Sequence, residues 1–117
     1  MKLQEVKDIL DAKILTEDAC LEEEVNSACG CDLMSDVLAF VKDKALLLTG
    51  LMNPQVVRTA EMMDITTIVF VRGKQPDQAI IDLAESKNIV LMSTQYPLYK
   101  ACGMLYEKGL GNEGGKA

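Results

Sequence analysis

One stretch of the chain, Ala45–Gly73, limits the folds that are open to it. Leu46–Thr49 and Thr67–Val71 are short apolar runs, each followed by a glycine turn, and Pro54–Asp64 between them has helical spacing. Continuous apolar runs of this length are typical of strands that are buried on both faces of a parallel sheet. The stretch therefore predicts two parallel strands joined by a crossover helix.

The same pattern continues toward the end of the chain. Pro54, Pro76 and Pro97 each lie just beyond a predicted strand, at nearly equal intervals. Proline is favoured in the first turn of a helix, where its missing N–H has no partner in any case. The second half is therefore expected to form three strand–turn–helix units, with strands Leu46–Thr49, Thr67–Val71 and Ile89–Met92 and helices Pro54–Asp64, Pro76–Lys87 and Tyr96–Lys108.

The first half is less regular. Leu3–Leu10 has the apolar stripe of a helix, and Lys13–Leu15 is a short candidate strand. Val25–Leu33 is interpreted as a strand in which Gly30 marks a bulge or a close backbone approach, and Ser35 is expected to be the N-cap of a helix that runs to about Lys42. The position of these first two strands in the sheet is left open. Since crossovers are right-handed, the fold class expected is α/β, with helices on both faces of a mainly parallel sheet of about five strands.

Composition sets the size and setting of this fold. Apolar residues make up 49% of the 117 residues, which suits one domain over residues 1–110 with a flexible glycine-rich tail over 111–117. The longest apolar runs fall far short of the roughly 20 residues that span a bilayer, and the N-terminus lacks the apolar centre of a signal peptide. We therefore expect a soluble, cytoplasmic protein.

Charge and residue types exclude several functions. The 12 basic and 18 acidic residues give a net charge of −6, and the basic residues form no cluster, so neither nucleic acid nor a membrane is an expected partner. Histidine is absent, and the sequence contains neither a phosphate loop nor a G-x-G-x-x-G motif. No serine or cysteine has a histidine to activate it. The chain is therefore predicted not to be an enzyme, and the sequence identifies no cofactor.

Four cysteines, Cys20, Cys29, Cys31 and Cys102, admit two interpretations. Their spacing does not match the paired C-x-x-C units of zinc sites, although Cys29 and Cys31 would share one face of a strand and so allow metal or redox chemistry. In a reducing compartment, cysteine more often serves as a small buried apolar residue. We favour the second interpretation and predict no metal site.

The candidate site lies where the predicted parallel strands end. In open α/β sheets ligands bind outside the carboxyl ends of the strands, and polar residues follow all three strands of the second half. An arginine there can hold a phosphate or carboxylate by paired hydrogen bonds. Glycine turns and helix caps, however, occur in α/β proteins whether or not a ligand binds. The predicted ligand-binding residues are Thr49, Gly50, Asn53, Arg72, Gly73, Ser93 and Thr94.

Two elements give the chain a family resemblance. T-G-x-x-x-P begins at Thr49, and a strand followed by R-G-x-x-P places Arg72 before Pro76. Together with the segments DLMSDVLAF and LLLTGLMNP they resemble the DRTGG domain, which is itself similar to the N-terminal domain of HPr kinase/phosphorylase. The naming segment Asp-Arg-Thr-Gly-Gly is not intact, since Thr49-Gly50 is followed by Leu51.

The resemblance implies a three-layer α/β/α sandwich, homodimerisation and a regulatory or accessory role. Such domains accompany phosphotransacetylases and CBS-domain proteins, including nucleotide-regulated pyrophosphatases, and some separate copies accompany hydrogenase genes. Our leading hypothesis is a non-catalytic regulatory module that binds an anionic metabolite or nucleotide at the carboxyl end of the sheet. The alternatives are an interaction subunit that docks on an enzyme partner, such as a hydrogenase, without a small ligand, and a cysteine-based redox or metal accessory protein.

Overall fold

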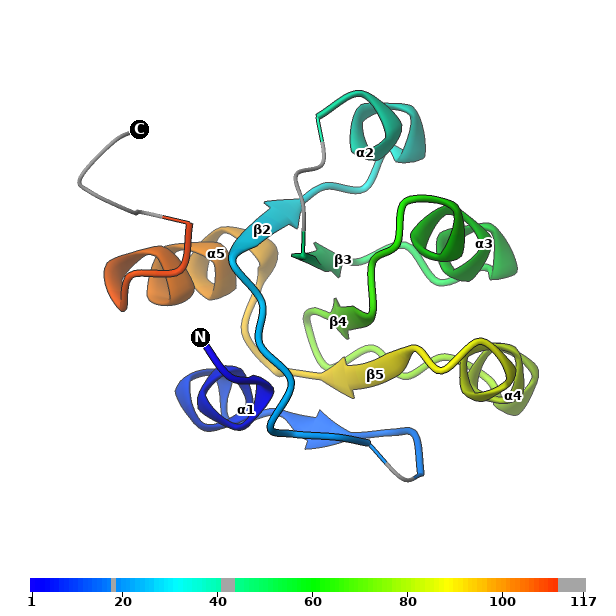
Figure 1. Cartoon of the computed structure of the whole chain (residues 1–117), viewed down its shortest axis with the longest axis horizontal. Helices are drawn as coiled ribbons and strands as arrows, with labels where there is room; N and C mark the ends of the chain where they lie inside the picture. Colours follow the sequence, from blue (N-terminus) through cyan, green and yellow to red (C-terminus); the bar gives the residue numbers. More distant parts are fainter. Residues whose placement is uncertain (18, 41–43, 112–117) are drawn as a thin grey trace.

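The computed structural model describes residues 1–17, 19–40 and 44–111 and shows one sheet between two helical layers (Figure 1). The sheet has five strands in the order β1-β5-β4-β3-β2. β2 to β5 are parallel, and β1 pairs with β5 in the antiparallel direction. The predicted α/β/α class is therefore confirmed. The strands are β1 (Lys13–Ile14), β2 (Ser27–Gly30), β3 (Ala45–Thr49), β4 (Thr67–Phe70) and β5 (Val90–Ser93).

The helices divide between the two faces according to their connections. The three that join successive parallel strands share one face, and the remaining two cover the other (Figure 1). The described parallel strands follow one another in chain order, so their order does not reverse to open a crevice. The helices are α2 (Met34–Phe40), α3 (Pro54–Met62) and α4 (Gln78–Ser86) on the first face, and α1 (Leu3–Leu10) and α5 (Leu98–Glu107) on the second.

Alternate residues of the strands supply both halves of the core. In β3 every residue is buried; Leu46 and Leu48 face α1 and α5, whereas Leu47 faces the layer of α2, α3 and α4. Residues of a strand point alternately to the two faces, so a strand that is covered on both sides reads as a continuous apolar run. This is the physical reason that the run at Leu46–Thr49 identified a central strand.

Several predicted boundaries need correction. β2 is shorter than Val25–Leu33. α2 starts at Met34, so Ser35 lies inside the helix and is not its N-cap, and the expected end of the helix at Lys42 lies outside the described residues. Only Pro54 occupies the first helical turn. Pro76 precedes the N-cap of α4, because the Asp77 carboxylate caps that helix by accepting from Ile80 N at 3.1 Å, and Pro97 is itself the N-cap of α5.

Most of the predicted tail over residues 111–117 lies outside the residues that the structure describes. Gly111 is described and has a φ of 75°, whereas residues 112–117 of the expected flexible tail lie outside the described residues. Across the described part of the chain, no helix is long and apolar enough to cross a membrane.

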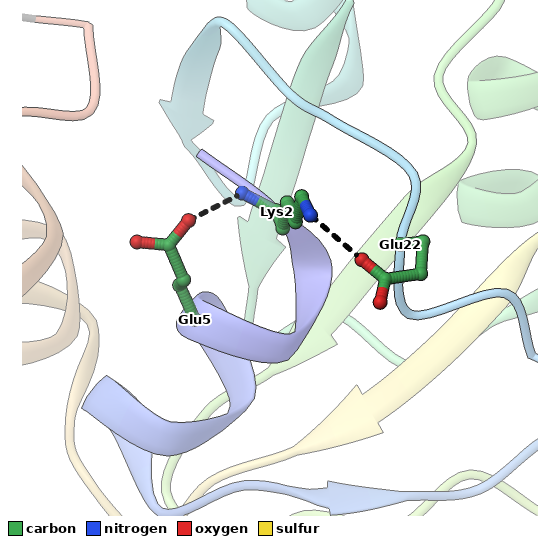
Figure 2. A network of polar contacts seen from close by, with 3 residues as sticks. All are labelled: Lys2, Glu5 and Glu22. Carbon is green, nitrogen blue, oxygen red and sulfur yellow. Dashed lines mark hydrogen bonds and ion pairs between the residues drawn. The ribbon is translucent and has the colours of Figure 1, made fainter.

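Polar contacts attach the start of α1 to the segment before β2. Leu3 N donates to Glu23 O at 2.9 Å, and Gln4 N donates to Leu21 O at 3.0 Å, so two N–H groups of the first helical turn are satisfied. Figure 2 shows that Lys2 N donates to the Glu5 carboxylate while Lys2 Nζ pairs with Glu22 at 2.9 Å. Exposed pairs of this kind contribute little, so the backbone bonds carry the attachment.

Gly30 is a test of how closely α5 packs on β2. A Cβ at this position would overlap Cys102 Sγ, which confirms the predicted close approach. We expect Gly30→Ala to lower the free energy of unfolding by about 1–3 kcal/mol, since an added methyl group forces its neighbours to shift. Urea unfolding at one protein concentration measures the change.

The Cys102→Ala background is the control for this prediction. With Sγ removed, Gly30→Ala should lower stability by less than about 1 kcal/mol, because the overlapping atom has gone. An equal loss in both backgrounds would contradict the packing argument. Gly103→Ala should change stability in the opposite direction, by about 1 kcal/mol, because no atom lies within 4 Å of its added Cβ and alanine favours the helix.

Candidate functional site

The turn after β3 is held by a carboxylate from another segment. Asp32, just after β2, accepts hydrogen bonds through Oδ1 from Thr49 Oγ1 at 2.9 Å and from Gly50 N at 2.7 Å. Leu51 N in turn donates to Thr49 Oγ1 at 3.1 Å. Because β2 and β3 are parallel neighbours, their carboxyl ends meet, and this places Asp32 beside Gly50. The turn is therefore fixed by contacts between two adjacent strand ends.

The surroundings of Asp32 stabilise its charged form. The hydrogen bond from Gly50 N lowers the pKa of the carboxyl group most strongly; the Thr49 bond and the positive charges of Arg72 and Lys74 lower the pKa further, against a partial burial that raises it. Donors directed at a carboxylate favour ionisation for simple electrostatic reasons. Asp32 is thus a permanent anion at neutral pH, next to two cations.

The turn after β4 has an unusual backbone. Arg72 and Gly73 have φ values of 59° and 69°, and Lys74 N closes the turn on Val71 O at 3.3 Å. Both central residues of the turn are left-handed, as in a type I′ turn. This conformation costs a non-glycine residue about 1–2 kcal/mol. Arg72 is therefore held in a conformation that asparagine or glycine would adopt more easily.

Backbone bonds to the next segment hold that turn. Arg72 N donates to Tyr96 O at 2.9 Å, and Gly73 N donates to Thr94 O at 2.8 Å. Gly73 also lies against the Gln95 side chain, which would overlap a Cβ there. These contacts explain both why glycine is required at residue 73 and how the strain at Arg72 is retained.

The two cations of this turn meet at Gly50. Lys74 Nζ donates to Gly50 O at 3.0 Å. The guanidinium of Arg72 lies so close that an added Cβ on Gly50 would stand 3.0 Å from its Nη2. The structure therefore brings together a compact set that we call the Gly50 cluster: Asp32, Thr49, Gly50, Arg72 and Lys74.

The predicted residues after β5 have internal partners. Ser93 Oγ donates to Lys74 O at 2.8 Å, so Ser93 borders the Gly50 cluster and supports its second turn. Thr94 Oγ1 is buried and donates to Leu10 O at 2.7 Å, where it satisfies a carbonyl at the end of α1. In the described contacts the Thr94 hydroxyl is thus directed to α1 rather than to Arg72.

Asn53, a predicted ligand-binding residue, is the N-cap of α3, but its side chain does not cap the helix. Its backbone O accepts from Val56 N at 3.1 Å, so that N–H already has a partner within the turn. Asn53 Oδ1 is buried without a hydrogen-bond partner among the described residues. Asn53 therefore contributes an unsatisfied oxygen, which suits a donor better than an anion.

Two of the four cysteines, Cys29 and Cys102, have surroundings that disfavour the thiolate. Burial raises the pKa of the Cys29 thiol, with smaller contributions from Cys31 and Cys102, and burial alone raises the pKa of Cys102. Over the described ranges, no three cysteine, aspartate, glutamate or histidine side chains are grouped to hold a metal ion. Reactive cysteines need the opposite shift, so the environment of these thiols gives the redox hypothesis no support.

Two residues of the Gly50 cluster were missed by the sequence-based choice of site. Asp32 follows a strand whose position in the sheet is left open by the sequence, and Lys74 belongs to the predicted turn after the fourth strand but is not among the predicted site residues. A parallel placement of Val25–Leu33 would have brought the end of that segment next to Thr49. The place of Asp32 in the cluster therefore follows from the order of the strands in the sheet and not from a sequence motif.

Replacing the Asp32 charge tests this geometry. We expect Asp32→Asn to lower the free energy of unfolding at pH 7 by about 1 kcal/mol, a modest value because the group is exposed. Since the folded pKa lies below the unfolded value of about 3.9, the stabilisation is present above pH 4 and is lost as pH falls through the folded pKa. Urea unfolding from pH 7 to 2.5 should show the two proteins converge; an unchanged gap at low pH, or an equal loss for Asp82→Asn on α4, would refute it.

Comparisons with known proteins agree with this architecture. A comparison with curated proteins gave no match. Among solved structures, the chain is similar to the CBS and DRTGG domains of the regulatory region of Clostridium perfringens pyrophosphatase, a complex with the activator diadenosine tetraphosphate, with 14% identity and a TM-score of 0.69. The match covers 95% of this chain and 48% of that one, so this chain spans about half its length. At this identity the likeness establishes the fold.

The family is established by sequence. The family model of the DRTGG domain matches residues 5–107, nearly the whole chain. The chain therefore belongs to the DRTGG domain family.

Proposed function

We propose that this protein is a non-catalytic regulatory module that binds an anionic metabolite or nucleotide at the Gly50 cluster. The observation that carries the proposal is the placement of both Arg72 and Lys74 beside Gly50 by one strained turn. Backbone strain of this kind persists where a structure over-determines it, and it is concentrated at functional positions. A binding role explains why arginine, rather than glycine, is at residue 72.

The charges of the cluster favour an anion, because the two cations Arg72 and Lys74 outnumber the Asp32 carboxylate. Asp32 offsets part of the positive charge, but its Oδ1 is already engaged by Thr49 and Gly50. Arg72 is exposed, so its planar donors are accessible to a phosphate or carboxylate in the paired geometry that arginine favours. The ligand class proposed is therefore a phosphorylated metabolite or a nucleotide.

The solved neighbour supports the nucleotide alternative by analogy. That regulatory region is complexed with diadenosine tetraphosphate, and its DRTGG domain shares this fold. By the same analogy we propose that this chain is an accessory module without catalytic activity. We propose further that it is a homodimer in the cytoplasm. An interaction subunit that docks on an enzyme partner without a small ligand is the alternative, and ligand titration distinguishes the two.

Calorimetric titration with AMP, ATP, inorganic phosphate and diadenosine tetraphosphate tests the proposal. Arg72→Gln should weaken binding at least tenfold, about 1.4 kcal/mol, because a charged bidentate contact is lost. Arg58, the other arginine, is exposed on α3, so Arg58→Gln is a matched control that should leave affinity unchanged. Binding no tighter than millimolar across the panel would reject the ligand and favour the interaction subunit.

Arg72→Gly separates binding from structure. Glycine adopts the left-handed conformation without strain, so the free energy of unfolding should stay the same or rise by up to about 1 kcal/mol after its extra chain entropy is counted. The same variant should lose ligand affinity as Arg72→Gln does. Thermal unfolding and calorimetry on one sample measure both effects. A loss of stability in Arg72→Gly would show that the arginine has a structural role.

A further inference from the structure

The two edges of the sheet are protected to different degrees. β1 is two residues long and includes the exposed Lys13, whereas β2 at the other edge has four residues, Ser27–Gly30, none of them charged or proline. Sheets discourage pairing with other chains by short edge strands, lysines and prolines. β2 has none of these features, so nothing in the strand itself discourages pairing, although Gly111 lies against its first two residues, where an added Cβ would stand 3.8 Å from Ser27 Cα and 4.0 Å from Ala28 N.

The backbone of β2 offers hydrogen-bonding groups on that side. Cys31 N donates to Leu48 O on β3 at 2.9 Å. Successive residues of a strand direct their N–H and C=O groups to opposite sides. The backbone groups of Gly30 and Ala28 therefore point away from β3, toward the side on which the described residues add no further strand.

An apolar groove follows this edge on the face of α5. It has a volume of about 760 Å³ and lies between β2 and α5. Tyr99, Cys102 and Tyr106 line it at positions i, i+3 and i+7, which places them on one side of the helix. The contact of Cys102 with Gly30 shows that this side faces β2. Tyr99 nevertheless has 93% of its surface exposed.

Exposed apolar side chains flank the edge on the other face as well. Leu33 and Leu38, before and within α2, are 58% and 44% exposed. Clustered exposed apolar residues mark interaction sites, whereas single ones are ordinary. Among the described residues, the large exposed apolar side chains near β2 are Leu33, Leu38, Tyr99 and Tyr106, and those elsewhere are Met52 and Met62, before and within α3.

We infer that a second copy of this chain pairs with the β2 edge, antiparallel strand to strand, and so joins two sheets into one. The inference rests on the homodimer of the proposed function and is independent of the ligand. A twofold axis perpendicular to the sheet pairs β2 with itself and places both α5 helices, antiparallel, on the same face. Tyr99 then lies opposite the partner's Tyr106, so the aromatic stripe is complementary to itself.

The dimensions agree with this arrangement. α5 packs over β2 and β3. With strands about 4.8 Å apart, two α5 helices related by the axis lie roughly 10 Å from each other, which is the spacing of packed helices. A standard interface buries about 800 Å² on each chain, about one eighth of the 6470 Å² surface of this one. Four residues of strand are too few for that area, so the helical flanks carry most of the contact.

Sedimentation of the full-length chain tests the inference. The wild type should sediment at twice the mass of one chain. Tyr99→Glu should raise the dimer dissociation constant at least tenfold, and it should leave the fold intact, since the side chain is exposed and an acidic residue suits the first turn of a helix. Met62→Glu makes the same change of charge at a residue of α3 that is 64% exposed, and it should remain dimeric.

A double variant tests the pairing itself. Tyr99→Glu/Tyr106→Lys places opposite charges across the twofold axis, so it should restore the dimer that Tyr99→Glu weakens, and high salt should weaken the restored dimer again. A wild-type monomer, an unaffected Tyr99→Glu dimer or a failed restoration overturns the inference. The inference is also overturned if the full chain is a monomer that dimerises only after residues 112–117 are removed. That result would mean that the chain's own tail, and not a second copy, occupies the β2 edge. Arg72→Gln should leave the dimer intact, which separates this result from ligand binding.

Discussion

The burial of β3 on both faces is the constraint on which the rest of the structure depends. Its alternate leucines enter two separate hydrophobic clusters, one under α1 and α5 and one under α2, α3 and α4. A strand of this kind needs a neighbour on each side and a layer of helices on each face. The crossover helices α2, α3 and α4 cover one face of the sheet, and α1 and α5 cover the other.

The sequence predicted the second half of the fold well because that half repeats one unit. The apolar runs and glycine turns gave the three parallel strands, and Asn88 and Gly109 have the positive φ values expected where α4 and α5 end. The helix starts were less certain from sequence, because Asp77 caps α4 and so displaces Pro76 from the first turn. The placement of β1 and β2 depends on tertiary contacts, which local pattern does not encode.

The predicted site residues follow the ends of β3, β4 and β5, but their side chains have different partners. Gly50, Arg72 and Thr49 meet in one cluster, whereas the Thr94 hydroxyl satisfies α1 and the Asn53 side chain caps nothing. A hydroxyl beside a strand end can form a hydrogen bond with nearby backbone groups instead of a ligand, because buried backbone groups need partners. The sequence does not show which of these partners the hydroxyl binds. Asp32 could be assigned to the cluster only after β2 was placed beside β3.

The hydrogen bond between Arg72 N and Tyr96 O connects features that are otherwise separate. Tyr96 comes just before the N-cap of α5, and α5 carries the aromatic stripe beside β2. A displacement of the Arg72 turn that keeps this hydrogen bond would also move Tyr96, and with it the segment that leads into α5. The chain thus has a direct mechanical connection, one turn and one hydrogen bond long, from the carboxyl end of its sheet to its open edge.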